Sequence, residues 1–204
     1  PAHTAAARIE RIRGVGARVE LVQGSYDDTV RRCAEVSAAS GWQVVADVGY
    51  DGYLDIPRLV SEGYSTLFVE MGELRPDLVL VQAGVGGLLH AAVDHFRAQD
   101  DPPILVAVEP VESNPLMTSI DSANGDPTES RGRLDSIMAG LNCGRVSLAA
   151  WPTIRNGVEL FITVTDRYTE DAMRLLARPS GGDPRIVAGE SGAAGLGGLL
   201  ALLQ

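Results

Sequence analysis

The segment Leu78-Val79-Leu80-Val81-Gln82-Ala83-Gly84-Val85-Gly86-Gly87 joins an apolar run directly to a glycine-rich turn. Its four leading apolar residues are typical of a parallel strand that is covered on both faces. Residues 88–98, which come next, have the periodicity of a helix. The order of strand, glycine turn and helix predicts a βα unit whose backbone amides can approach a ligand at the turn.

The same alternation of strand and helix patterns continues along the chain. Further strands are expected at residues 18–22, 42–48, 104–108, 159–165 and 185–188. Helices are expected at residues 4–13, 24–40, 56–69 and 169–177, with a last apolar helix after residue 195. Residues 121–133 are polar and rich in glycine and serine, as in an irregular loop. This order predicts an α/β fold with open parallel sheets and flanking helices.

The composition excludes several classes of protein. The 204 residues are 45% hydrophobic and 22% charged, which is enough to bury the core of one domain or two small lobes. With 17 basic and 27 acidic residues, the net charge of −10 argues against nucleic-acid binding. All 17 basic residues are arginine, so the chain holds no lysine for catalysis or for a P-loop.

Cysteine usage and hydropathy indicate the cellular setting. Cys33 and Cys143 are too few and too far apart for a disulfide framework, and no ligand spacing indicates a metal site. No apolar stretch approaches the ~18 residues of a membrane span, and no signal peptide opens the chain. We expect a cytoplasmic protein without membrane or metal. Because the chain begins without Met and ends inside an apolar pattern, we expect a piece of a longer protein.

The glycine turn at residues 84–87 is the first candidate site. Glycines between a strand and a helix let backbone amides reach a phosphate, although tight packing is the alternative explanation. A dinucleotide site is a second possibility, because Glu109 ends the next strand where a ribose-binding acid lies in such sites. Leu89, however, occupies the position of the third glycine in that motif.

Asp47 is the second candidate, since it ends an apolar run and is followed by Gly49 and Gly52. A carboxylate at such a strand end can transfer protons when partial burial raises its pKa. Capping of a turn is the alternative role.

Two more candidates lie in turns of small residues. Ser191, before the last helix, has a hydroxyl that could bind a ring nitrogen of a ligand or cap the helix. Gly140 lies in an apolar turn that could form the floor of a pocket. We expect Cys143 to be structural, and His90 and His95 to pack or face solvent.

Taken together, these segments resemble the fold-type II family of pyridoxal-phosphate enzymes, and within it the ammonia-lyases that act on 2,3-diaminopropionate. The resemblance is carried by residues 24–28, 47–57, 82–86, 108–110, 137–141, 183–186 and 189–192. It implies an incomplete architecture like that of tryptophan synthase beta. Residues 1–54 would be the remainder of a smaller α/β lobe, 55–76 a crossover, and 77–204 a larger cofactor-binding lobe.

The resemblance also implies an activity and roles for residues. The family releases pyruvate and ammonia from 2,3-diaminopropionate in amino-acid catabolism, with pyridoxal 5'-phosphate as electron sink, and acts as a homodimer. Residues 84–87 (Gly84, Val85, Gly86 and Gly87) would hold the cofactor phosphate. Ser191 would face the pyridine nitrogen, Gly140 would lie near the ring, and Asp47 would be the acid/base carboxylate.

Two departures from the family pattern leave alternatives open. The first is Gly87, which stands where the family often has serine. The second is the absence of the lysine that forms the Schiff base, from which we expect the chain to be about the C-terminal two-thirds of a subunit. A catalytically inert, truncated or degenerate domain that binds pyridoxal phosphate or a partner chain is the second hypothesis. A nicotinamide-dependent oxidoreductase that uses the glycine turn and Glu109 is the third.

Overall fold

The computed structural model describes all 204 residues, and the chain divides into two compact units, Pro1–Val44 and Val45–Gln204. The lobe boundaries expected at residues 54 and 76 remain predictions. No helix is both long enough and apolar enough to cross a lipid bilayer.

The first unit consists of the helices α1 (Ala6–Gly14) and α2 (Tyr26–Ser40). A capping box opens α2: the amide of Asp28 donates to the Ser25 hydroxyl (3.2 Å), and the amide of Ser25 donates to the Asp28 carboxylate (2.8 Å). Gly41 ends the helix in the left-handed conformation, at φ 67°. Both ends of α2 therefore lie where the sequence predicts them.

The second unit is built on a parallel sheet of β1 (Leu78–Gln82), β2 (Ile104–Pro110) and β3 (Leu160–Val164), in the order β1-β2-β3. Val81 lies opposite Ala107 in the register. The helices of this unit are α3 (Asp55–Glu70), α4 (Gly87–Arg97), α5 (Pro115–Ile120), α6 (Trp151–Gly157), α7 (Asp166–Ala177) and α8 (Ala194–Leu202), with a 3-10 turn η1 at Ala139–Leu141. The predicted α/β fold with a parallel sheet and flanking helices is confirmed.

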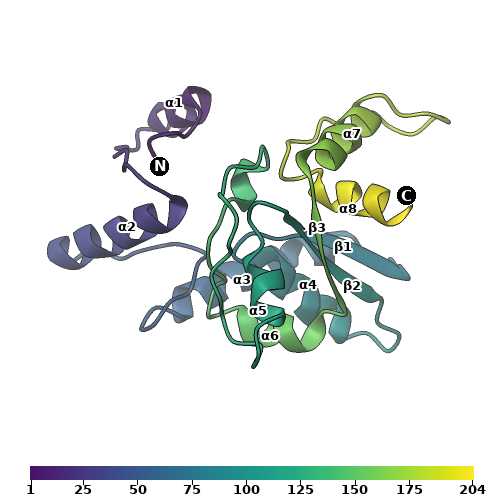
Figure 1. Cartoon of the computed structure of the whole chain (residues 1–204), viewed down its shortest axis with the longest axis horizontal. Helices are drawn as coiled ribbons and strands as arrows, with labels where there is room; N and C mark the ends of the chain where they lie inside the picture. Colours follow the sequence, from purple (N-terminus) through teal and green to yellow (C-terminus); the bar gives the residue numbers. More distant parts are fainter. The chain divides into compact units, whose positions relative to one another are not determined.

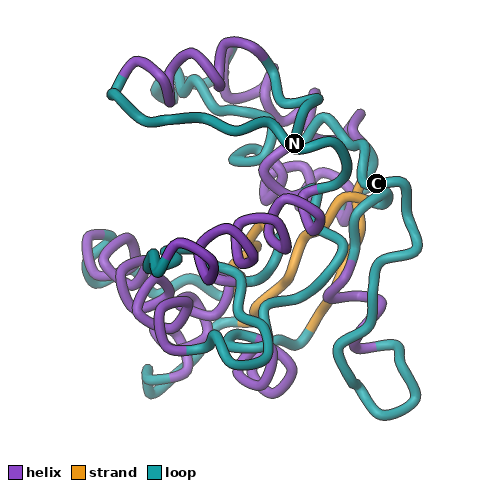
Figure 2. Tube along the Cα trace, turned by 90° about the vertical axis from the view of Figure 1, so that its left-hand side faces the viewer, coloured by secondary structure: helices purple, strands orange, loops and turns teal.

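Helices lie on both sides of the sheet of the second unit (Figures 1 and 2), and the sheet separates two hydrophobic cores. On one face, Val81 and Leu105 pack with apolar residues of α3, α4 and α6. On the other face, Val106 and Val108 pack with residues of β3, α8 and the segment at Met138–Leu141. Because neighbouring strand residues point to opposite faces, the continuous apolar runs fill both cores.

The glycines of α8 let this helix lie close to the sheet. A Cβ added at Gly198 would lie 2.7 Å from Cγ2 of Val108, and one added at Gly195 would lie 3.0 Å from the carbonyl oxygen of Leu80. Side chains at these positions would push α8 away from β1 and β2. The turn at residues 189–193, just before α8, is thereby held near the carboxyl ends of the strands.

Three predicted strands are wrong, at residues 18–22, 42–48 and 185–188. Each has an alternating or apolar pattern, but a strand also needs a neighbour that satisfies its backbone groups. These segments make isolated hydrogen bonds instead, such as those from Ala2 to Val22 (2.8 Å) and from Ile186 to Leu176 (2.9 Å). The short helices α5 and α6 were not predicted.

The close packing of α8 predicts opposite effects for two glycine-to-alanine substitutions within helices. Gly198→Ala should lower the free energy of unfolding by ~1–2 kcal/mol, because overpacking against Val108 outweighs the better helix propensity of alanine. Gly63→Ala in α3 is the matched control, since no atom lies within 4 Å of its added Cβ. It should raise the free energy of unfolding by ~0.5–1 kcal/mol. Urea denaturation of both variants measures the difference, and changes of the same sign would refute the packing argument.

Candidate active site

The glycine loop, Gly84 to Gly87, links the carboxyl end of β1 to the first turn of α4 and is buried throughout. A Cβ at Gly84 would lie 3.1 Å from Sγ of Cys143 and 3.3 Å from the carbonyl oxygen of Gly140. Gly86 has φ +103°, a conformation that side chains disfavour. The loop therefore favours glycine at positions 84 and 86, and it places the first amides of α4 at the positive end of the helix, where an anion is stabilised.

The η1 turn and the segment before α8 add a second pair of groups. The amide of Gly140 donates to the hydroxyl of Ser191 over 2.9 Å, and a Cβ at Gly140 would lie 3.0 Å from that oxygen. The Ser191 hydroxyl accepts this bond and keeps its own proton to donate. The structure thus brings together Gly84, Gly140 and Ser191, which lie far apart in the sequence.

Asp47 lies half-buried in a loop that is fixed on both sides. The amide of Ala46 donates to the hydroxyl of Tyr53 (2.9 Å), and the amide of Gly49 donates to the hydroxyl of Ser147 (2.7 Å). The amide of Ser147 in turn donates to the carbonyl of Val85 in the glycine loop (2.8 Å). The structure therefore connects the Asp47 loop to the glycine loop through a single residue.

Tyr64 of α3 lies near both Asp47 and the glycine loop, and the sequence did not indicate it as a site residue. Burial, and secondly the negative charge of Asp47, raise the pKa of the Tyr64 phenol above its ordinary value. Its ring carbon Cε2 lies 3.5 Å from the position of a Cβ on Gly87. The phenol, which is protonated at neutral pH in any case, therefore stays protonated to a higher pH than an exposed tyrosine. The helical spacing of Pro57, Ser61, Tyr64 and Phe68 could have indicated that Tyr64 faces inward.

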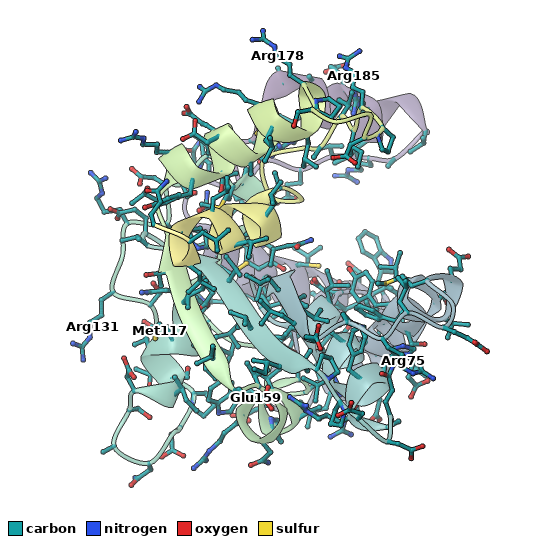
Figure 3. All side chains as sticks on the ribbon, turned by 90° about the vertical axis from the view of Figure 1, so that its right-hand side faces the viewer. Arg75, Met117, Arg131, Glu159, Arg178 and Arg185 are labelled. Atoms are coloured by element: carbon teal, nitrogen blue, oxygen red, sulfur yellow. The ribbon has the colours of Figure 1, made fainter.

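Glu109, at the end of β2, does not have the role of a ribose-binding acid. Its side chain is fully buried, and its two carboxylate oxygens accept the amides of Leu116 and Met117 over 2.8 Å each; Met117 is labelled in Figure 3. Burial raises its pKa to about 8, although the two amides act in the opposite direction. Glu109 therefore holds the start of α5. Because its side chain is buried and both oxygens are bonded, it is not available to a ribose, which argues against the nicotinamide hypothesis.

The other candidate polar residues have structural roles, as expected. His90 is buried, with Nε2 at 3.3 Å from the carboxylate of Asp94, and His95 stacks on Phe68. Cys143 is buried and its amide donates to Ser113. The structure contains no cluster of three or more His, Cys, Asp or Glu side chains that could hold a metal ion.

Comparisons of sequence place the chain among known proteins. The family model described as pyridoxal-phosphate dependent enzyme matches residues 1–204. Diaminopropionate ammonia-lyase of Escherichia coli K12 is 38% identical over 212 residues, which cover 99% of this chain and 52% of that protein. The corresponding protein of Salmonella typhimurium LT2 is 35% identical, over 97% of this chain and 51% of its own length. The chain thus spans about half the length of these relatives, less than the two-thirds expected, and its assignment to the C-terminal portion remains a prediction.

Comparisons with solved structures agree with the sequence comparisons. The E. coli diaminopropionate ammonia-lyase in complex with an aminoacrylate-PLP azomethine reaction intermediate has a TM-score of 0.87 and 36% identity, over 99% of this chain and 53% of that one. The processed form of threonine deaminase isoform 2 from Solanum lycopersicum has a TM-score of 0.77 at 18% identity, over 97% of this chain and 54% of its own. This second likeness shows the fold alone, which is that of the fold-type II enzymes.

The burial of Glu109 predicts a dependence of stability on pH. Its pKa rises from 4.5 to about 8 on folding, so between these values the folded state binds a proton that the unfolded state has lost. The free energy of unfolding should therefore fall as the pH rises through this window. Glu109→Gln, which stays neutral, should show a smaller fall. Urea denaturation between pH about 5 and about 8 compares the two slopes, and equal slopes would contradict the raised pKa.

Proposed function

The chain belongs to the family of pyridoxal-phosphate dependent enzymes, and from this premise we propose that it supplies active-site residues to an enzyme that eliminates ammonia from 2,3-diaminopropionate, giving pyruvate and ammonia. The observation that carries the proposal is the convergence of the glycine loop, the Gly140–Ser191 pair and the Asp47 loop at the carboxyl ends of the strands. In open parallel sheets, ligands bind at this end.

The residues at this end fit pyridoxal phosphate. The amides of the glycine loop and of the first turn of α4 would hold the phosphate, since they lie at the positive end of that helix. Gly140 would lie beside the ring, and the Ser191 hydroxyl would donate to the pyridine nitrogen. When bound, the cofactor withdraws electrons from the α-carbon of the substrate.

The proton-transfer role is assigned to Asp47. Its carboxylate oxygens would accept the proton released from the α-carbon of the substrate, in a loop whose backbone is held at Ala46 and Gly49. Tyr64, whose phenol is protonated at neutral pH, would donate a hydrogen bond in the same region. Arginine is the only basic residue type besides histidine in these 204 residues, so the lysine that links the cofactor in this family is not among them.

The missing lysine favours one alternative, a domain that binds pyridoxal phosphate or a partner chain without turnover. The two functions are distinguished with the natural polypeptide expressed from its intact gene. The enzyme should release ammonia and pyruvate from 2,3-diaminopropionate and show a visible absorbance band with pyridoxal phosphate that borohydride removes. Binding without turnover would support the alternative instead.

We further propose a homodimer that acts on a small amino acid in cytoplasmic amino-acid catabolism. The resemblance to the fold-type II lyases supports the dimer, and the isolated cysteines Cys33 and Cys143 suit a reducing compartment. Light scattering of the natural polypeptide measures its oligomeric state directly.

The role of Asp47 predicts a specific loss of rate. Asp47→Asn in the natural polypeptide should lower kcat by about 10²–10⁴-fold, because the amide cannot accept the proton, while the absorbance of the bound cofactor is kept. Asp51→Asn, an exposed carboxylate in the same loop, is the matched control and should keep kcat. A kcat that is unchanged in Asp47→Asn would exclude Asp47 from the proton transfer.

A further inference from the structure

Ser147 is a buried serine that bonds to two separate parts of the candidate site. Its hydroxyl accepts the amide of Gly49 over 2.7 Å, and its own amide donates to the carbonyl of Val85 over 2.8 Å. The residue is 1% exposed, so water cannot replace either bond at low cost. One residue therefore bridges the Asp47 loop and the glycine loop.

The contact around Gly49 leaves little room for movement. The amide of Leu148 donates to the Gly49 carbonyl over 2.9 Å, so both backbone groups of Gly49 are bonded to the segment at residues 147–148. A Cβ added at Gly49 would lie 2.8 Å from the Cβ of Ala149. Asp47 thus lies two residues from a backbone position that is fixed by packing and by hydrogen bonds.

On the other side of Asp47, Tyr53 makes an attachment that is local to the loop. Its hydroxyl accepts the amide of Ala46 over 2.9 Å, and its ring stacks on Tyr50 with centroids 4.9 Å apart. This attachment lies within the loop itself, since Tyr50 and Tyr53 also pair through an isolated bridge. It fixes the shape of the loop, whereas Ser147 fixes its place beside the glycine loop.

We propose that Ser147 is a positioning residue that holds the carboxylate of Asp47 in its working place relative to the glycine loop. The inference rests on the proposed function. Removal of the hydroxyl leaves the buried amide of Gly49 without an acceptor, and the loop must shift to hydrate it. A displacement of about 1 Å in a catalytic group lowers the rate by up to about a hundred-fold while binding surfaces stay intact.

The test uses Ser147→Ala in the natural polypeptide, with Ser119→Ala as the matched control. Ser119 is equally buried, and its hydroxyl donates to Pro115 (2.6 Å) and accepts the amide of Thr128 (2.9 Å), all within α5 and its following loop. Both variants lose a buried hydroxyl, so both should lose stability. Only Ser147→Ala should speed the hydrogen exchange of the Gly49 amide and lower kcat, by about ten- to a hundred-fold, with KM and the absorbance of the bound cofactor kept.

Tyr53→Phe is the second variant, for the case that Ser147→Ala fails to fold. Tyr53→Phe removes the acceptor of the Ala46 amide. It should speed the hydrogen exchange of the Gly49 amide and lower kcat, both by less than Ser147→Ala does. Unchanged exchange at Gly49 in Ser147→Ala, or faster exchange with an unchanged kcat, would overturn the inference. If the unsubstituted polypeptide releases no ammonia, the proposed function fails, and the exchange at Gly49 still decides whether Ser147 fixes the Asp47 loop.

Discussion

The contact between the glycine loop and the segment at residues 139–150 is the constraint on which the second unit depends. A Cβ added at Gly84 would make tight contacts with Cys143 and with the Gly140 carbonyl, and Gly86 has a positive φ that disfavours any side chain. The bond from the amide of Ser147 to the carbonyl of Val85 ties the two segments together. Because these backbones touch, the amide ends of α4, the η1 turn and the start of α6 are fixed in one place.

Local signals in the sequence were enough to predict the elements that carry their own caps or their own burial pattern. The capping box at Ser25 and the glycine at position 41 bounded α2, and continuous apolar runs located β1 and β2. The same reasoning gave false strands at residues 18–22, 42–48 and 185–188, since an apolar or alternating pattern does not state whether a neighbouring strand exists. The short helix α5 was missed because it is capped from a distance, by the carboxylate of Glu109.

The candidate site was predictable to the extent that its residues have unusual local chemistry. The glycine loop, Asp47 and Ser191 stand out at strand ends and in turns, and the structure connects all three regions. Ser147 and Tyr64 carry no such signal, because an isolated serine or an inward-facing tyrosine occurs throughout any sequence. Ser147 matters through a contact across about a hundred residues of chain, the bond from Gly49. Tyr64 matters through its neighbours Asp47 and Gly87 on other elements, and no local pattern records either contact.

The two ends of the sheet have opposite chemistry, and this difference accounts for the location of the site. At the amino ends of β2 and β3, Glu159 (labelled in Figure 3) accepts the amide of Leu105 over 2.8 Å. It also pairs with Arg97, which bonds in turn to the carbonyl of Gly157. Arg97 and Glu159 thus neutralise one another at that end. At the carboxyl ends, the first amides of α4 lie at the positive end of the helix, where an anion would be stabilised, and the Glu109 side chain is fully buried. In the function that we propose, proton transfer at this end needs a carboxylate outside the core, and the half-buried Asp47, in a loop bonded to Ser147 beside the glycine loop, would supply it.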